Sequence, residues 1–236
     1  MIQTHNNLAF SGAPGTCKSV VARLMARIMQ EQGYGTGAYV EAGREDLIGE
    51  YLGQTSPKIA QLFERAKGGV LFIDEAGALV KQEKDLYVAE AVNALVRHME
   101  IELDTMVIFA TYPDDMKDLL ATNPGLSSRI SRVLEFPSYT QKELWQIFVY
   151  LAEQQRFCVE DDCMKKCEEF FQKLQKKKGK NFGNGREARR LLDAAIEELA
   201  LTCQENEEVS MDCITKTIME RAQDLLLEQS GNLNER

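Results

Sequence analysis

The sequence of 236 residues contains no long hydrophobic run. A membrane-spanning helix needs about 18 or more consecutive apolar residues, and no segment approaches that length. The first ten residues, MIQTHNNLAF, have neither the basic flank nor the apolar centre of a secretory signal. We therefore expect no membrane association and a cytoplasmic location.

Basic residues are also few. The 28 lysines and arginines stand against 37 aspartates and glutamates, which gives a net charge of -9. Proteins that bind DNA, RNA or anionic membranes through phosphate contacts need an excess of basic side chains. The balance argues against general nucleic-acid binding and leaves room only for a local basic groove.

The sequence has two histidines and six cysteines. Cys158, Cys163 and Cys167 form the one closely spaced group, and their spacing matches no standard zinc finger. Disulfide frameworks are typical of short secreted chains. We expect free thiols, with a metal site at this group as the less favoured alternative.

Five short apolar runs in the first part of the chain are typical of β-strands. They cover residues 7–11, 38–42, 68–76, 106–111 and 132–136. Their nearly continuous apolar character predicts a sheet that is covered on both faces and is therefore parallel. Amphipathic segments lie between the runs, one of them from Leu86 to Met99 and another starting at Thr55-Ser56-Pro57, where a hydroxyl cap precedes proline. Alternating strands and helices indicate an α/β fold.

The pattern changes after Pro137, where no further strand is expected. The sequence TQKE at 140–143 is a capping box that predicts a helix to about residue 153. Further helices are expected near 160–176, 185–203 and 210–228, with Gly183-Asn184-Gly185 as a break. We therefore predict an α/β domain at 1–137 and a small all-helical domain at 138–236.

The segment SGAPGTCKS follows the first expected strand and precedes a helical pattern, VVARLMARIM. It resembles G-x-x-x-x-G-K-[ST], a loop whose backbone N–H groups and following helix N-terminus face nucleotide phosphates. Lys18 would neutralise the β- and γ-phosphates of ATP, and the Ser19 hydroxyl would bind Mg²⁺. The nucleotide-contacting residues expected here are Gly12, Ala13, Pro14, Gly15, Thr16, Cys17, Lys18 and Ser19.

Cys17 stands where this pattern has its last glycine. Glycine has no Cβ, so the backbone can approach a phosphate closely, whereas cysteine adds a Cβ and a sulfur. The loop either tolerates the cysteine, or binds nucleotide weakly or not at all. A third reading is a redox-sensitive brake, because helix N-termini and lysines favour the thiolate form of a cysteine.

A second motif, which is acidic, strengthens the prediction of a nucleotide-binding site. The apolar run GGVLFIDEA places Asp74 and Glu75 at the end of a strand. In phosphoryl-transfer sites such an acidic residue helps to hold Mg²⁺. Glu75 would polarise a water molecule for attack on the γ-phosphate.

Together, GAPGTCKS and LFIDEA make the chain resemble an AAA+ ATPase, and the resemblance extends over nearly the whole chain. The stretches LIGEYLGQTSPKIAQLFERAKGGVLFIDEA and NPGLSSRISRVLEFPSY resemble the CbbX and stage V sporulation protein K (SpoVK) group. The resemblance implies a P-loop NTPase fold with a five-stranded parallel sheet and a helical lid. Members of the group are associated with Rubisco reactivation or sporulation. AAA+ domains usually have a segment before the first strand, so we expect that a longer protein was trimmed or that the segment is missing.

The resemblance also implies roles for residues outside the two motifs. Thr111 falls at sensor 1, where asparagine is usual. Arg129 matches the arginine finger that reaches the ATP of a neighbouring subunit, with Arg132 as an assistant. Arg186 matches sensor 2 on the lid, with Arg189 nearby; surface arginines are the alternative for both sites.

The tripeptide Tyr51-Leu52-Gly53 matches the pore loop of related machines. Such loops line a central channel and grip a threaded polypeptide. On its own the tripeptide would carry little weight, but its place between the second expected strand and the next helix favours the pore role.

Three functions are therefore weighed. The first is a ring-forming ATPase, a homo-hexamer or part of a mixed AAA+ ring, that remodels or threads a protein client. The second is a regulatory or structural subunit with an impaired nucleotide site, favoured by Cys17 and Thr111. The third, a DNA-acting module such as a helicase loader, is disfavoured by the acidic charge.

Overall fold

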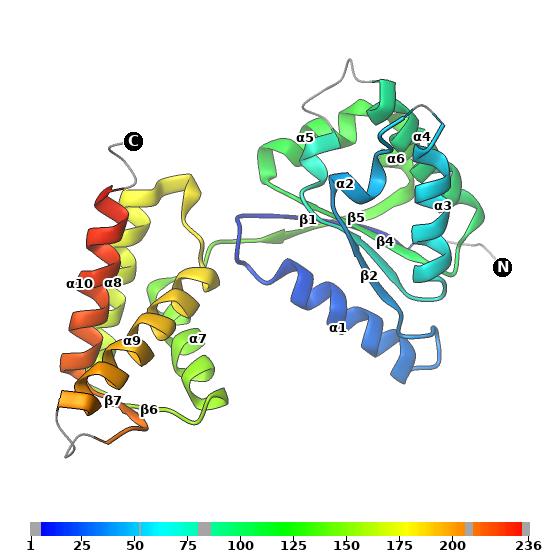
Figure 1. Ribbon diagram of the computed structural model, residues 1–236. Helices are drawn as coiled ribbons and strands as arrows, with labels where there is room; N and C mark the ends of the chain where they lie inside the picture. The colour runs from blue at the N-terminus through cyan, green and yellow to red at the C-terminus, as the bar shows by residue number, and fades with distance from the viewer. Residues whose placement is uncertain (1–5, 52, 80–85, 206–209, 233–236) are drawn as a thin grey trace. The chain divides into compact units, whose positions relative to one another are not determined.

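The computed structural model describes residues 6–51, 53–79, 86–205 and 210–232 (Figure 1). The chain divides into two compact units. The first comprises residues 1–13 and 17–137, and the second comprises residues 14–16 and 138–236. The short segment Pro14–Thr16, in the expected phosphate loop, therefore groups with the C-terminal unit.

The first unit is built on a parallel sheet of five strands in the order β2-β3-β4-β1-β5. The strands are β1 (Asn7–Gly12), β2 (Tyr39–Ala42), β3 (Val70–Ile73), β4 (Met106–Thr111) and β5 (Ile130–Phe136). The predicted α/β fold with a parallel sheet is confirmed. β5 is an edge strand whose residues are largely exposed, in contrast to the buried β1 and β3.

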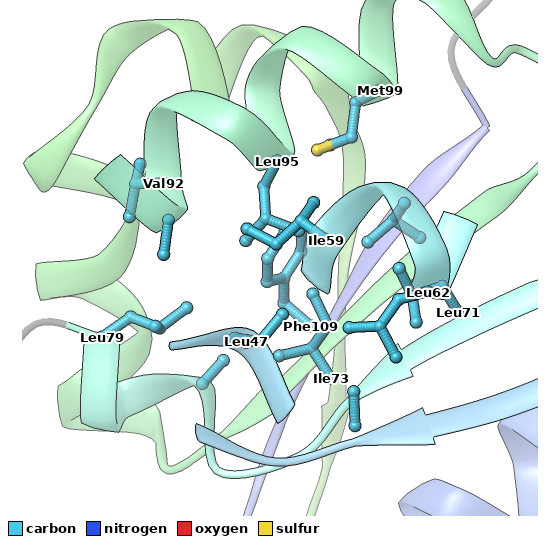
Figure 2. Close-up of a cluster of buried hydrophobic side chains, with 14 of the residues drawn as sticks. Leu47, Ile59, Leu62, Leu71, Ile73, Leu79, Val92, Leu95, Met99 and Phe109 are labelled. Carbon is cyan, nitrogen blue, oxygen red and sulfur yellow. The ribbon is translucent and has the colours of Figure 1, made fainter. Parts of the chain in front are cut away.

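Helices cover both faces of this sheet (Figure 1). They are α1 (Lys18–Glu31), α2 (Arg44–Leu47), α3 (Thr55–Ala66), α4 (Leu86–Ile101), α5 (Pro113–Thr122) and α6 (Pro124–Arg129), with a 3-10 turn, η1, at Ala76–Leu79. Alternate strand residues point to opposite faces. Phe10 and Phe72 pack against α1, whereas Leu71 and Phe109 belong to the core under α3 and α4 (Figure 2).

The helix α3 begins where it was expected, but its N-cap differs from the expectation. The helix begins at Thr55 itself, and neither Thr55 nor Ser56 caps it. The Thr55 hydroxyl is buried and accepts a hydrogen bond from the Gly49 amide at 3.1 Å. The hydroxyl therefore fixes the preceding loop, which carries Tyr51.

The second unit is mainly helical, as predicted. Its elements are α7 (Gln141–Gln154), β6 (Cys158–Val159), α8 (Cys163–Lys178), η2 (Gly179–Asn181), α9 (Gly185–Glu205), β7 (Cys213–Ile214) and α10 (Lys216–Asn232). The capping box of Thr140 and Glu143 is present. The expectation of no strand is wrong for two short segments, because β6 and β7 pair in parallel over two residues each.

The cysteine expectation is corrected in part. Cys158 and Cys213 lie opposite each other on β6 and β7 and form a disulfide. Cys17, Cys163, Cys167 and Cys203 are free thiols. The two bonded residues are 55 positions apart in sequence, so spacing alone gave no sign that they meet.

Within the described ranges, no helix has the length and apolar character to cross a bilayer. The same ranges hold no cluster of three or more histidine, cysteine, aspartate or glutamate side chains arranged for a metal. The cytoplasmic location stays a prediction.

Candidate nucleotide-binding site

The carboxyl ends of three neighbouring strands bring the sequence motifs of the first unit together. β3, β4 and β1 are adjacent and parallel, so their carboxyl ends meet at one edge of the sheet. Gly12 ends β1, Asp74 follows β3, and Thr111 ends β4. Ligands of open α/β sheets bind outside this edge.

The loop from β1 to α1 folds back on its own lysine. Lys18 Nζ donates hydrogen bonds to the carbonyl oxygens of Gly12 and Ala13, each at 2.9 Å. Lys18 is the first residue of α1, and Ser19 is the second. The ammonium group and the Ser19 hydroxyl therefore lie at the N-terminus of a 14-residue helix, which favours anions.

Cys17 takes the left-handed backbone conformation, with φ 64° and ψ 24°. Glycine adopts this region without strain, whereas other residues rarely do. The backbone conformation is therefore a second reason for glycine at this position, in addition to the close approach to a phosphate that the sequence indicated. The thiol is exposed and makes no capping hydrogen bond to α1.

The tip of the loop, Pro14–Thr16, is held within the second unit. Gly15 has φ +70°, and a Cβ at this position would collide with the carbonyl oxygen of Gly183. The Gly185 amide donates to the Gly15 carbonyl at 3.0 Å. Gly15 is therefore required by its backbone conformation and by this close approach.

Asp74 and Glu75 form a tight turn after β3. The Glu75 amide donates to Asp74 Oδ1 at 2.9 Å, and the Glu75 side chain is exposed. Glu75 has φ 51°, an uncommon value for a residue other than glycine. Strained backbone of this kind clusters at functional sites, which motivates a catalytic role for Glu75.

Thr111 lies beside the loop, because it pairs in register with Ser11 of β1. Its side chain is buried, and its Oγ1 accepts a hydrogen bond from the Gly77 amide at 3.1 Å. The hydroxyl expected at sensor 1 therefore binds the 3-10 turn that follows Asp74 and Glu75. Gly77 was not singled out from the sequence, and it was one glycine among 16.

Arg129 is bound within the first unit. Its Nη2 lies 2.8 Å from Oε2 of Glu100 on α4, and its Nη1 donates to the Gly125 carbonyl at 2.8 Å. The side chain is 17% exposed. Among the described residues its Nε has no hydrogen-bond partner. Arg132 is exposed on β5.

Arg186 is exposed in the second unit, in the first turn of α9. It lines an open cavity of about 810 Å³, together with Pro14, Lys177, Lys178 and Arg190. The buried carboxylate of Glu187 in this wall pairs with Lys178 at 2.8 Å. Arg189 is also exposed.

The expected pore-loop residues lie before α3. Tyr51 is 67% exposed, and Gly53 has φ +84° with open space where a Cβ would lie. Leu52 lies outside the described residues. An exposed aromatic beside a conformationally free glycine fits a loop that contacts other molecules.

Asn184 was expected only as part of a helix break, and it lies against the tip of the loop. It is fully buried, and its amide group contacts Pro14 of the loop. An asparagine between two glycines is typical of the left-handed conformation, and Asn184 has φ 48°. That signal indicates the conformation but not the contact partner.

Comparisons with known proteins match both parts of the chain to family models. The family model described as "ATPase family associated with various cellular activities (AAA)" matches residues 8–138, and the AAA lid domain model matches residues 140–230. The match covers the sheet, the loop and the strand ends of the first unit.

Curated relatives share the sequence over most of this chain. A "Protein CfxQ homolog" from Pyropia yezoensis is 40% identical over 192 residues, which is 80% of this chain and 63% of that protein. A chloroplastic "Ribulose bisphosphate carboxylase/oxygenase activase" from Cyanidioschyzon merolae is 38% identical over 192 residues, 80% of this chain and 65% of that protein. The chain thus spans a little under two thirds of these relatives.

Solved structures support the fold. The FIGL-1 AAA domain in complex with ADP aligns with a TM-score of 0.63 and 18% identity, covering 94% of this chain and 72% of that chain. The Thermotoga maritima RuvB branch migration motor aligns with a TM-score of 0.64 and 21% identity, covering 94% of this chain and 62% of that chain. At these identities the likeness concerns the fold alone.

Proposed function

Because the chain belongs to the AAA ATPase family, with CfxQ proteins among its relatives, we propose that it binds and hydrolyses ATP in a ring and remodels a protein client. One observation carries the proposal. The loop that opens α1 and the Asp74-Glu75 turn lie at the same edge of the sheet, one strand apart. This arrangement supports the proposal, because the loop and the acidic pair lie where ligands of such sheets bind.

The loop residues fit a nucleotide with Mg²⁺. The Ser19 hydroxyl and the half-buried Asp74 carboxylate are oxygen ligands, the kind that Mg²⁺ prefers. Bound Mg²⁺ would offset the charge of the phosphates. Lys18 exchanges its bonds to loop carbonyls for contacts with phosphate oxygens, and Arg186 contributes a second cation from the lid. The left-handed backbone at Cys17 supports the reading that the loop keeps its shape with cysteine in place of glycine.

Hydrolysis in this proposal depends on three further side chains. Glu75 accepts a proton from the attacking water. Thr111, whose hydroxyl holds Gly77, keeps the turn that carries Glu75 in place beside the loop. Arg129 acts in a neighbouring subunit and stabilises the charge on the transferred phosphoryl group. To do so, Arg129 leaves Glu100.

The client in this proposal is a protein that passes Tyr51. Its exposed ring gives sequence-tolerant contact, and Gly53 lets the loop move with the nucleotide state. A relative named as a Rubisco activase supports a protein client. The assembly is a homo-hexamer or a mixed AAA ring.

Phosphate release measured over a range of protein concentrations tests the proposal. We expect turnover per subunit to rise with concentration and to disappear when Mg²⁺ is chelated. Glu75→Gln should lower turnover by about 100-fold or more while ATP binding persists. Glu64→Gln, an exposed glutamate on α3, is the matched control and should leave turnover unchanged. Equal background activity in all three proteins would contradict hydrolysis.

That contradictory result would favour a second function, a regulatory subunit with an impaired nucleotide site. The observation behind it is that the Thr111 hydroxyl is buried and bound to Gly77, while Cys17 adds strain to the loop. Mixing this chain with an active AAA partner separates the two functions. A regulatory subunit changes the turnover of the partner, and Glu75→Gln does not alter that change.

A further inference from the structure

Asn184 is a fully buried polar residue with a left-handed backbone, directly before α9. A buried amide group is costly unless its donors and acceptor are satisfied. The surroundings of Asn184 therefore show what the side chain is built to bind.

The amide group of Asn184 joins three segments of the second unit. Its Nδ2 donates to the carbonyls of Pro14 at 3.1 Å and Phe182 at 3.3 Å. Its Oδ1 accepts from the Tyr139 amide at 2.9 Å. A longer contact of 3.5 Å reaches Ser138 Oγ. One side chain thus links the loop tip, the start of the lid and the turn before α9.

The backbone after Asn184 adds a second tie to the loop tip. The Gly185 amide donates to the Gly15 carbonyl at 3.0 Å. Two successive loop carbonyls, those of Pro14 and Gly15, are therefore bound by neighbouring groups at Asn184 and Gly185. Gly15 allows this approach because a Cβ on Gly15 would collide with the Gly183 carbonyl.

These two ties orient the amides of the phosphate loop. No peptide bond in the described chain is cis. In a trans peptide the C=O and the following N–H point in opposite directions. Binding the Pro14 and Gly15 carbonyls therefore turns the Gly15 and Thr16 amides away from Asn184 and Gly185. Loop amides of this kind face the phosphates in phosphate-binding loops.

We propose that Asn184 is a positioning residue for nucleotide binding, which sets the direction of the Gly15 and Thr16 amides. The inference rests on the proposed function, because the amides act on a bound nucleotide. Asn184 lies two residues before Arg186, so the same turn places the lid arginine and the loop tip. Asparagine suits the position because it tolerates the left-handed region and offers both donors and an acceptor.

Two variants of the full chain separate these roles. Asn184→Asp keeps the shape and the acceptor for Tyr139 but cannot donate to the Pro14 carbonyl. Asn184→Gly keeps the left-handed backbone and removes every side-chain bond. Gln155→Glu, an exposed residue after α7, is the control for an added negative charge in the same unit.

Two measurements are made on each protein. The first is hydrogen–deuterium exchange of the segment 11–20 in nucleotide-free protein, with α7 and α9 as internal references. The second is the Kd of a fluorescent ATP analogue with Mg²⁺, together with KM and kcat. We expect faster exchange at 11–20 with unchanged exchange in α7 and α9. We also expect the Kd and KM to rise by about 10- to 100-fold with a smaller change in kcat. The reason is that the Pro14 and Phe182 carbonyls lose the donor that Asn184 supplies.

The outcomes are distinguishable. Unchanged exchange at 11–20 and unchanged Kd in both variants would overturn the positioning role. Faster exchange across the whole second unit, with Kd unchanged, would assign Asn184 to lid folding alone and also overturn it. If the unaltered chain does not bind the analogue, the proposed function fails, and the exchange measurement alone decides whether Asn184 orients the loop. If Asn184→Asp fails to fold, Asn184→Gly carries the test.

Discussion

Arg129 forms an ion pair with Glu100, with Nη2 and Oε2 2.8 Å apart, inside the unit that carries both residues. To act on the ATP of a neighbouring subunit, as proposed above, Arg129 must leave Glu100. Glu100 is 63% exposed, so the pair is partly screened by solvent and contributes little to stability. Glu100→Gln should therefore retain ATP turnover within about twofold, whereas Arg129→Ala should lose about 10³-fold or more.

The comparison separates catalysis from folding for Arg129. Arg129→Ala also removes the hydrogen bond from Nη1 to the Gly125 carbonyl, which keeps its bond from the Ser128 hydroxyl, so thermal stability should fall in this variant. Turnover measured well below the melting temperature of each protein removes that effect. Arg132→Ala, at an exposed position on β5, is the matched arginine control. Equal losses of turnover in Glu100→Gln and Arg129→Ala would assign Arg129 a structural role only.

The left-handed backbone at Cys17 predicts the order of stability among variants at this position. An L-residue in this region costs about 1–2 kcal/mol, and glycine avoids most of that cost. Cys17→Gly should leave stability unchanged or raise it by up to about 1 kcal/mol, because glycine loses more chain entropy on folding. Cys17→Val should lower the stability by about 1–2 kcal/mol, since β-branched residues fit the region worst.

Urea unfolding of nucleotide-free protein measures the order of stability among the Cys17 variants. Cys17→Ala, which keeps the strain without the sulfur, is the control. Lower stability of Cys17→Gly than of Cys17→Ala would contradict the backbone assignment.

The exposed thiol of Cys17 should react with an alkylating reagent before the buried thiols of Cys163 and Cys167. Burial raises the pKa of the Cys163 thiol to about 12 and holds that of Cys167 still further above its usual range. The thiolate is the reactive form, so both should resist alkylation at pH 8, while the exposed Cys17 reacts. Mass spectrometry after brief iodoacetamide treatment measures the order. Under denaturing, non-reducing conditions, four thiols should react, with Cys158 and Cys213 added after reduction. Protection of Cys17 by Mg·ATP would place the nucleotide at the loop.

The periodic and motif-bearing parts of the structure were predictable from the sequence. β3 and β4 appeared as continuous apolar runs because both faces of these strands are buried. Thr140 and Glu143 correctly predicted the start of α7, because a capping box depends only on residues that are close in the chain. These signals are local, and a single sequence contains them.

Contacts between distant residues were not predictable in the same way. Asn184 meets Pro14 across 170 positions, and Arg129 meets Glu100 across 29. The expected hydroxyl cap of α3 was wrong because the Thr55 hydroxyl binds Gly49 rather than its own helix. The left-handed conformation of Cys17 follows from the loop it completes, and cysteine itself gives no sign of it.

Glu143 gives a pH-dependent contribution to stability. Its carboxylate accepts hydrogen bonds from the Thr140 amide at 2.7 Å and the Thr140 hydroxyl at 2.9 Å. The backbone hydrogen bond, and then the hydroxyl, lower the pKa of Glu143 below its ordinary value of 4.5. A lowered pKa in the folded state means that folding favours the ionised form, so the contribution is fully present above pH 4.5 and is lost as pH falls through the folded value. Urea unfolding of the unaltered chain and Glu143→Gln should therefore differ at pH 7, and the difference should shrink below pH 4.5. Glu153→Gln, near the other end of the helix, is the control, and a difference that stays constant down to pH 3 would contradict the role of the carboxylate.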